Sequence, residues 1–284
     1  MKRPRLVPLG LAPLALVALL GLVHPARLLA QDQHPSSGKI GDVERSADNA
    51  KKKGSDHADD DEGGFFGGSV RFFLRAMWHA AVYVPRDTGQ GYIAYPYAGP
   101  LDGATFVVRD VFRGRTFGNI SAAYFKDAGS TLSGVHFAVE WVGGMLDRVI
   151  EYSHFTEPTA EGTDRLSMLH VGVAALPPIG DLGYLRIGAA FQSIFTDQGD
   201  AAMGPELVLG TQLFPKRPFG VDVTARLAAL TWGGGPEHGT GFVDLIAHGS
   251  VFLGRTELQA GYRWTRVGVG APFSGPTLGM RLWF

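Results

Sequence analysis

The chain of 284 residues contains no cysteine. This absence excludes disulfide bonds, and it also excludes zinc or iron–sulfur sites built on thiolate ligands. No glycine-rich loop follows a strand pattern and opens a helix, so nucleotide binding has no support. From Phe117 onward no helical pattern separates the strand patterns, which excludes the βαβ fold classes for that part.

Residues 1–30 have the pattern of a secretory signal peptide. Three basic residues precede an apolar run from Leu6 to Val23, and a small residue, Ala30, ends the segment. We predict cleavage after Ala30. The alternative is an uncleaved membrane anchor, because 18 apolar residues are just long enough to span a bilayer. Two prolines in the run and its short flanks disfavour that alternative.

Removing residues 1–30 takes away four basic residues and no acid, so the mature charge is 22 − 27 = −5. This negative balance argues against nucleic acid as a partner. Residues 31–64 are polar, carry blocks of lysine and of acid, and contain few large apolar residues, which predicts a disordered periplasmic linker. His34 and His57 lie near acids there, but we interpret both as solvated linker residues. No metal and no cofactor is predicted.

Residues 117–284 repeat one unit about every 17 residues, in which alternating apolar and polar positions end in Gly, Pro, Asp or Asn. Alternation with period two predicts strands. The predicted strands are 117–126, 131–142, 146–156, 164–176, 183–196, 204–213, 218–231, 241–253, 255–267 and 275–284. Ten strands without intervening helices predict an all-β, antiparallel barrel.

Alternation divides the strand side chains into an apolar set and a polar or small set. In a soluble sandwich the apolar set would point inward, whereas in a transmembrane barrel it faces lipid and the polar set lines the lumen. In the barrel the predicted lumen charges are Glu140, Glu151, Arg186, Glu206, Asp222, Arg226, Asp244, Glu257, Arg263 and Arg281. Six acids and four guanidinium groups in a narrow space should pair, because a lone buried charge is costly.

The connections between strands favour the transmembrane interpretation. Those after the odd-numbered strands are mostly longer and more polar than those after the even-numbered strands, as in outer-membrane barrels with long outer loops and short periplasmic turns. Aromatic residues also fall near both predicted strand ends, which resembles two interfacial girdles. The outer girdle would contain Tyr124, Phe195, Trp232 and Trp264, and the inner girdle Trp141, Phe214, Phe219 and Phe284.

The chain ends "TLGMRLWF", with apolar residues at every second position before the final aromatic. Leu278, Met280, Leu282 and Phe284 share one parity. This pattern resembles the carboxy-terminal strand of bacterial outer-membrane β-barrel proteins, although Pro276 fills the next such position less typically. The resemblance implies that these four residues are recognised by periplasmic chaperones and by the barrel-assembly machinery. It also implies that the last strand closes against the first and leaves no edge.

The segment 65–116 is ambiguous. Residues 69–85 alternate like a strand, but Arg71, Arg75 and His79 lie four apart like one stripe of a helix. We favour an amphipathic helix that lies on the inner leaflet or caps the barrel mouth. The strand alternative would add a further strand near 104–112 and give twelve strands. A barrel of ten strands is close to the diameter at which side chains fill the interior. We therefore expect a plugged barrel with at most a thin water path.

Two arrangements deserve consideration as catalytic sites. His248 and Ser250 resemble the His-x-Ser pair of outer-membrane lipid A deacylases and phospholipases, with Glu257 placed to orient the histidine, but the pair is predicted to face the lumen. Glu237 and His238 weakly resemble the site of omptin proteases, but that site needs paired aspartates on an opposite strand top. Asp197 and Asp200 lie only in a neighbouring loop. We therefore assign no catalytic residue.

The sequence predicts a bacterial outer-membrane barrel with a periplasmic N-terminal segment and a structural, adhesive or narrow-pore role, in contact with outer-membrane lipid. A membrane enzyme of the deacylase or omptin type is the first alternative. A soluble secreted barrel that carries a small ligand is the second. The sequence leaves the oligomeric state open.

Overall fold

The fold was analysed in a computed structural model, which describes residues 38–55, 116–143, 146–160, 162–179, 182–197, 199–233 and 238–284. One helix, α2 (Lys39–Ser55), precedes the strands. The strands are β1 (Thr116–Lys126), β2 (Ser133–Gly143), β3 (Leu146–Thr159), β4 (Gly162–Ala175), β5 (Pro178–Ile179), β6 (Gly183–Thr196), β7 (Ala201–Lys216), β8 (Phe219–Trp232), β9 (Gly239–Leu253), β10 (Thr256–Val267) and β11 (Phe273–Trp283).

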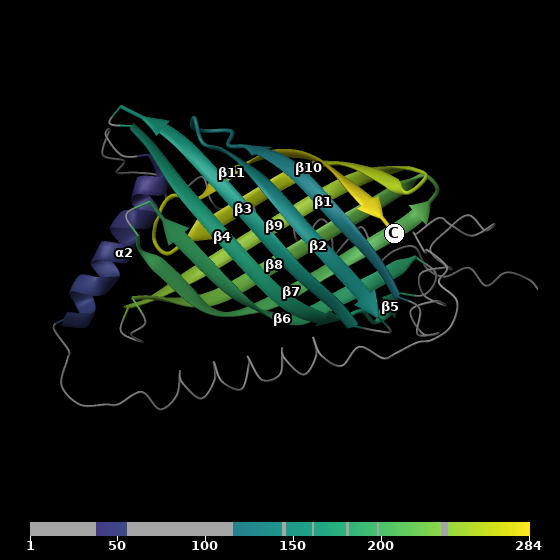
Figure 1. Ribbon diagram of the computed structural model, residues 1–284, viewed down its shortest axis with the longest axis horizontal. Coiled ribbons are helices and arrows are strands. Elements are labelled where there is room, and N and C mark those ends of the chain that lie inside the picture. Colours follow the sequence, from purple (N-terminus) through teal and green to yellow (C-terminus); the bar gives the residue numbers. More distant parts are fainter. Residues whose placement is uncertain are drawn as a thin grey trace, which may run out of the picture. The chain divides into compact units, whose positions relative to one another are not determined.

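The strands form one closed antiparallel barrel (Figure 1). Consecutive strands pair as hairpins, β4 pairs with β6, and β1 pairs with β11 to close the ring. β5 is a two-residue strand inside the β4–β6 connection and pairs only with the start of β6. The wall therefore has ten strands, which confirms the predicted fold class.

The closing seam joins the two ends of the strand region. Register runs from Asn119 opposite Trp283 to Phe125 opposite Thr277. The amide and carbonyl of Gly118 also exchange hydrogen bonds of 2.9 Å with the backbone of Phe284. A side chain at Gly118 would collide with the ring of Phe284, since a Cβ there would lie 2.7 Å from it. Closure leaves no sheet edge exposed, as the last-strand pattern predicted.

Helix α2 corrects the predicted organisation of the N-terminal part. Residues 39–55 lie inside the stretch 31–64 that we predicted to be disordered, and they form a helix instead. Ile40, Val43 and Ala47 have the spacing of one helix face, and they are almost completely buried against the barrel. A short helix with so few apolar residues gains its stability from tertiary packing, which composition alone does not reveal. The signal peptide 1–30 and the capping helix at 69–85 lie outside the described residues.

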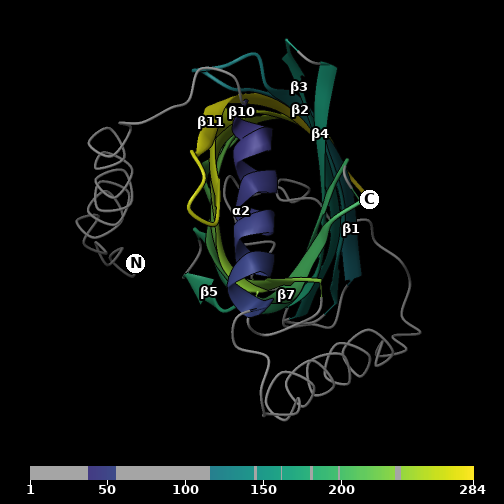
Figure 2. The same ribbon diagram turned by 90° about the vertical axis from the view of Figure 1, so that its left-hand side faces the viewer.

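The barrel has two distinct ends. The loop end carries the connections after β1, β3, β6, β8 and β10, and the turn end carries the other connections and the C-terminus. Figure 2 looks onto the loop end, with α2 lying across it. The strands are longer than predicted at several ends, so loop lengths differ less between the two ends than the sequence suggested. β7, for example, spans Ala201–Lys216 instead of 204–213.

Candidate functional site

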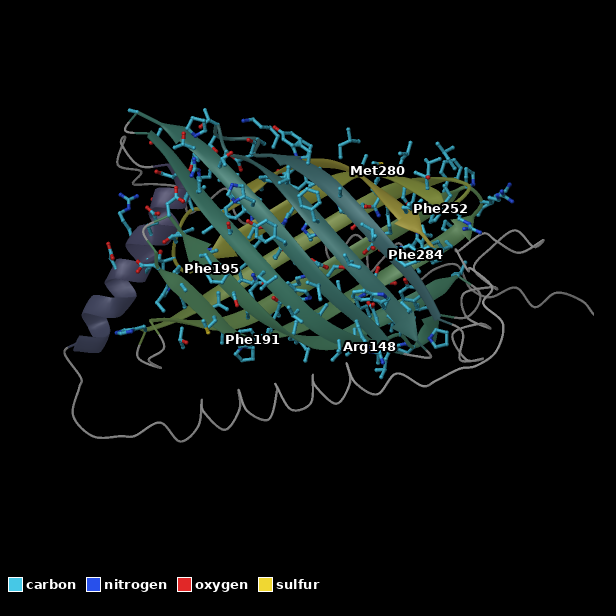
Figure 3. The ribbon with its side chains drawn as sticks, viewed as in Figure 1. Arg148, Phe191, Phe195, Phe252, Met280 and Phe284 are labelled. Atoms are coloured by element: carbon cyan, nitrogen blue, oxygen red, sulfur yellow. The ribbon has the colours of Figure 1, made fainter. Side chains whose placement is uncertain are left out.

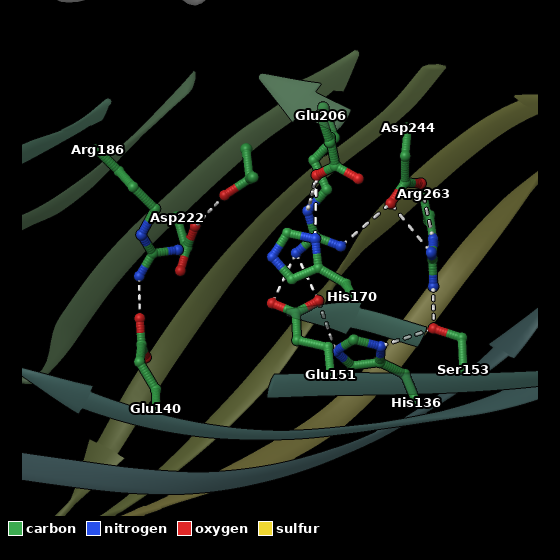
Figure 4. A network of polar contacts seen from close by, with 12 residues as sticks. His136, Glu140, Glu151, Ser153, His170, Arg186, Glu206, Asp222, Asp244 and Arg263 are labelled. Carbon is green, nitrogen blue, oxygen red and sulfur yellow. Dashed lines mark hydrogen bonds and ion pairs between the residues drawn. The ribbon is translucent and has the colours of Figure 1, made fainter. Parts of the chain in front are cut away.

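The barrel interior holds all ten charged residues that the sequence placed there. Nine of them expose at most 9% of their surface, and Arg186 is only slightly more exposed. Their strands alternate buried polar residues with exposed apolar ones, so one parity of each strand supplies the network in Figure 4. These ten charges therefore lie on the inward parity of their strands.

Arg226 on β8 is the centre of this network. Its Nη2 lies 2.6 Å from Glu151 on β3, which stands across the barrel. Its other nitrogens lie 3.5 Å from Asp244 and 3.9 Å from Glu206, on the strands to either side. One guanidinium therefore joins opposite walls of the barrel and compensates three buried carboxylates.

A second guanidinium, Arg263 on β10, also spans the interior. It donates two hydrogen bonds to Asp244, at 2.8 and 3.0 Å, and a third of 3.2 Å to Ser153 on β3. Two parallel bonds to one carboxylate fix both planes and strengthen the pair. The Thr265 hydroxyl donates to the same carboxylate at 2.7 Å. These contacts place a rigid polar layer towards the loop end.

The charges nearer the turn end form a third group around Arg281. This residue lies 3.4 Å from Asp222 and 3.5 Å from Glu257. The indole of Trp283 donates to Glu257 at 2.8 Å. Arg281 and Trp283 share the inward parity of the last strand, opposite to that of Leu278, Met280, Leu282 and Phe284. Here the indole N–H gives Trp283 a polar role.

Asp147 is a lumen carboxylate that the sequence analysis missed. It is 1% exposed and lies 3.0 Å from Nε of Arg186, which also pairs with Glu140. Asn119 donates to the same Glu140 at 2.6 Å. Asp147 has the parity of Glu151 on β3, so the signal was present. Its position directly after the β2–β3 turn made it look like a turn residue.

Two histidines join the network from the wall opposite Arg226. Nδ1 of His170 lies 3.0 Å from Glu206. His136 contacts Ser153 through Nδ1 at 2.9 Å and approaches Glu151 through Nε2 at 3.7 Å. These contacts extend the polar layer across β2, β3, β4 and β7.

Apolar layers lie above and below the charges. At the turn end, the rings of Tyr184, Phe214, Phe252 and Trp283 follow one another with centroids 5.9–6.3 Å apart. At the loop end, buried apolar residues from the strand ends form a cluster with the buried face of α2. Its members include Phe125, Phe155, Leu166, Ile194, Leu230, Trp232, Phe242 and Phe273. The network thus lies between two apolar layers.

Helix α2 is anchored to the loop end by two polar contacts. Nζ of Lys39 donates to both oxygens of Asp127, at 2.9 and 3.1 Å. The amide of Ile40 donates to Glu157 at 2.9 Å. Amides of the first helical turn lack partners within the helix, and a carboxylate there also complements the helix dipole. Glu157 of β3 therefore caps α2 from outside the helix.

Asp127 strengthens this anchor as an ionised group. Burial would raise the pKa of Asp127, but hydrogen bonds from Lys39 and from the amides of Ser274 and Gly129 hold its pKa below the usual range. A carboxyl whose pKa is lowered by docking contributes stability above its ordinary pKa and loses it as pH falls through the lowered value. The Lys39–Asp127 contact is therefore fully formed at neutral pH.

The contribution of Glu44 of α2 to docking has the opposite dependence on pH. Burial raises the pKa of Glu44, and the nearby charges of Asp164, Asp197, Asp200 and Asp48 raise it further. A carboxyl with a raised pKa favours the docked helix while it is protonated, and this contribution is lost as pH rises through the raised pKa. Docking of α2 at neutral pH thus depends on its apolar face and on the two contacts at its N-terminus.

The first of the two catalytic arrangements considered from the sequence is not assembled among the described residues. His248 hydrogen-bonds through Nε2 to Thr277, at 2.9 Å, while Ser250 is buried. Glu257 is engaged by Arg281 and Trp283. His238 contacts the carbonyl of Trp232 at 3.1 Å, and Glu237 lies outside the described residues. His248 is therefore bonded to Thr277, on β11, and not to Ser250 or Glu257.

The outer wall is apolar. Large apolar side chains of most strands are exposed, among them Phe195, Met280 and Phe284 in Figure 3. The side chains of the last-strand pattern, Leu278, Met280, Leu282 and Phe284, are 68%, 57%, 52% and 42% exposed. An exposed apolar wall around a polar interior is the architecture of outer-membrane β-barrels, so this part of the resemblance is confirmed.

The predicted aromatic girdles need correction. Tyr124 and Phe195 near the loop end, and Trp141, Phe219 and Phe284 near the turn end, are exposed as expected. Trp232 and Phe214, however, are completely buried inside the barrel. Both have the inward parity of their strands, where they belong to the two apolar layers. Their position near strand ends was correctly predicted, but their side was not.

The described residues contain neither a membrane-spanning helix nor a metal-binding cluster. Among them, no helix is both long enough and apolar enough to cross a membrane. The same residues contain no group of three or more His, Asp and Glu side chains arranged to hold a metal ion.

The chain is similar to solved outer-membrane proteins at low sequence identity. No family model and no curated protein matches the sequence. Among solved structures, Neisserial surface protein A is 11% identical, with a TM-score of 0.28, over 60% of this chain and 96% of that one. The beta domain of the Bordetella autotransporter BrkA is 12% identical, with a TM-score of 0.34, over 60% and 98%. The fold assignment therefore rests on the strand register described above.

Proposed function

We propose that this chain is a sealed outer-membrane barrel with a structural role, and not a pore. The observation that carries the proposal is the bridging of opposite walls by Arg226 and Arg263. A ten-stranded barrel is narrow, and the described side chains that join its walls stand across the path that water would take. The apolar layers at both ends support the same conclusion. Of the three roles predicted from the sequence, a structural one fits this interior best.

The exposed wall supports placement in the outer membrane. A soluble barrel that carries a ligand would have to leave this entire apolar surface in water, which soluble monomers rarely do. We propose outer-membrane lipid as its surroundings. We further propose that chaperones and the barrel-assembly machinery recognise Leu278, Met280, Leu282 and Phe284, since these side chains are exposed on the closing strand.

The barrel could be inserted with its loop end facing either the outside of the cell or the periplasm. Longer loops are expected outside the cell, but α2 contacts the loop end and the sequence predicted a periplasmic N-terminal segment. Outward loops and a periplasmic α2 exclude each other, because α2 (residues 39–55) contacts the loop end and this end faces only one side of the membrane. Biotinylation of a cysteine placed at the exposed Gly129 of the β1–β2 loop, in intact cells, distinguishes them. Labelling means that the loop end faces outward, and protection means that it faces the periplasm.

Single-channel recording tests the sealed interior. The refolded mature chain should give no discrete conductance steps in a planar bilayer, because the described interior is bridged at several levels. Flotation of the same preparation with vesicles, together with the far-ultraviolet circular dichroism of a β-barrel, controls for insertion and folding. Discrete, reproducible steps from inserted wild-type protein would contradict the proposal and restore the narrow-pore role.

A further inference from the structure

Three polar side chains form a cluster on the outer wall of the barrel. Nδ1 of His154 on β3 lies 3.0 Å from Oγ of Ser167 on β4, and the hydroxyl of Tyr152 lies 3.2 Å from the same Oγ. His154 and Ser167 are direct partners in the β3–β4 register. The rings of Tyr152 and His154 stack, with centroids 6.4 Å apart. The cluster is thus held by the wall and not by a loop.

The cluster faces away from the lumen. The neighbours of its members along both strands, Ser153, Phe155, Leu166 and Met168, are at most 4% exposed and point inward. By alternation, Tyr152, His154 and Ser167 point outward, and Tyr152 is 42% exposed. A histidine and a serine bonded to each other on a lipid-facing wall are unusual, because polar side chains there are costly and tend to be functional.

The cluster stands at the boundary between the polar and apolar parts of this wall. Towards the loop end, the outward residue that follows it on β4 is Arg165, which is exposed. Towards the turn end, the next outward residues are the apolar Leu169, Val171 and Val173 on β4 and Ile150 on β3, and the outward residue of β3 beyond Ile150 is Arg148. A membrane lipid has the same order along its length, namely an anionic phosphate, an ester and an acyl chain.

We propose that Ser167, His154 and Tyr152 form a hydrolytic site for acyl esters of membrane lipids. This inference rests on the proposed membrane placement of the barrel. Ser167 is the nucleophile, His154 is the general base, and Tyr152 is a hydroxyl donor beside the reacting oxygen. Arg165 would hold the lipid phosphate, about 7 Å further along the strand. The acyl chain would lie along the apolar wall below.

The chemistry balances with water as the only co-reactant. Oγ of Ser167 attacks the ester carbonyl while its proton passes to Nδ1 of His154. The ester C–O bond then breaks, and His154 returns the proton to the oxygen of the leaving alcohol, which is the deacylated lipid. Water attacks the acyl-serine with His154 again accepting a proton, and a free fatty acid and the original hydroxyl are formed.

The barrel provides a matched control for this site. Tyr262 and Ser274 also form an outward hydroxyl pair, 3.2 Å apart, on β10 and β11. The cross-strand partner of Ser274 is Trp264 and not a histidine. Ser274→Ala therefore removes the same kind of Tyr–Ser contact without removing a Ser–His pair.

The test is fatty-acid release by the refolded mature chain from two lipid sources. One set of vesicles contains phosphatidylglycerol and phosphatidylethanolamine, and the other also contains an acylated, phosphorylated glucosamine disaccharide. Release from the first set identifies a phospholipid substrate, and release only from the second identifies the glycolipid. Ser167→Ala should lower release by about three orders of magnitude, while Ser274→Ala leaves it unchanged. A fluorophosphonate probe should label the wild-type chain at Ser167.

Two results would overturn the inference. They are release that is unchanged in Ser167→Ala, and the absence of both release and a Ser167 adduct from a barrel that floats with the vesicles. The second result leaves the proposed function intact. Conversely, Ser167-dependent release from lipid–detergent micelles by a chain that never floats with vesicles would support the site and contradict membrane placement.

Discussion

Replacing Arg226 with alanine should lower the free energy of unfolding by about 3–5 kcal/mol, the usual cost of removing one partner from a buried ion pair. The loss leaves Glu151, Glu206 and Asp244 facing one another without the cation that now lies within 2.6–3.9 Å of each. Like charges in a water-poor interior repel strongly. Urea unfolding of the barrel in lipid vesicles, followed by tryptophan fluorescence, measures the change.

Two further variants separate the network from general effects of mutation. Arg255→Ala changes an exposed residue of the β9–β10 turn and should alter stability by at most about 0.5 kcal/mol. Replacing Arg226 and Glu151 together by methionine should recover part of the loss, because apolar residues of similar volume often replace a buried pair without cost, while Glu206 and Asp244 still lose the cation. Equal unfolding curves for Arg226→Ala and wild type would show that the pairing does not stabilise the barrel.

Placing arginine at Ile150 should cost about 2–4 kcal/mol, as expected for a cation on a lipid-facing wall near the middle of the membrane. Ile150 is 45% exposed and lies between Val139 and Val171 in the sheet register. In water, an exposed arginine at the same position would be nearly neutral. Urea unfolding in vesicles again gives the measurement.

The matched control is Val269→Arg. Val269 is 81% exposed and lies in the β10–β11 connection, beyond the strand ends. An arginine there stays in water or at the headgroups, so we expect no measurable change. If Ile150→Arg were as harmless as Val269→Arg, the wall around β3 would not face lipid.

The fold could be predicted from the sequence because strand alternation encodes which side each residue faces. The same parity placed all ten predicted charges inside and the last-strand residues outside. The wrong predictions of which side a residue faces were confined to strand ends, where parity was not applied. Asp147 was taken for a turn residue, and Trp232 and Phe214 were placed in girdles by their height along the strand although their parity pointed inward.

Other features depended on contacts between distant segments. Helix α2 carries few apolar residues, and its docking relies on Asp127 of the β1–β2 loop, 88 residues from Lys39, and on Glu157 of β3, 117 residues from Ile40. The His154–Ser167 contact depends on the β3–β4 register, because the two residues are 13 positions apart in the chain. A sequence motif search looks for short fixed spacings such as His248–Ser250, and therefore found a pair that the structure does not assemble.

The most direct test of the account is tryptophan quenching by brominated acyl chains. In single-tryptophan variants, the exposed Trp141 should be quenched strongly, whereas Trp283, which is 1% exposed and bonded to Glu257 inside the barrel, should be protected at nearly the same height. That difference is what a barrel with a lipid-facing wall and a sealed interior predicts. Equal quenching of the two, or none of Trp141 in protein that floats with the vesicles, would contradict it.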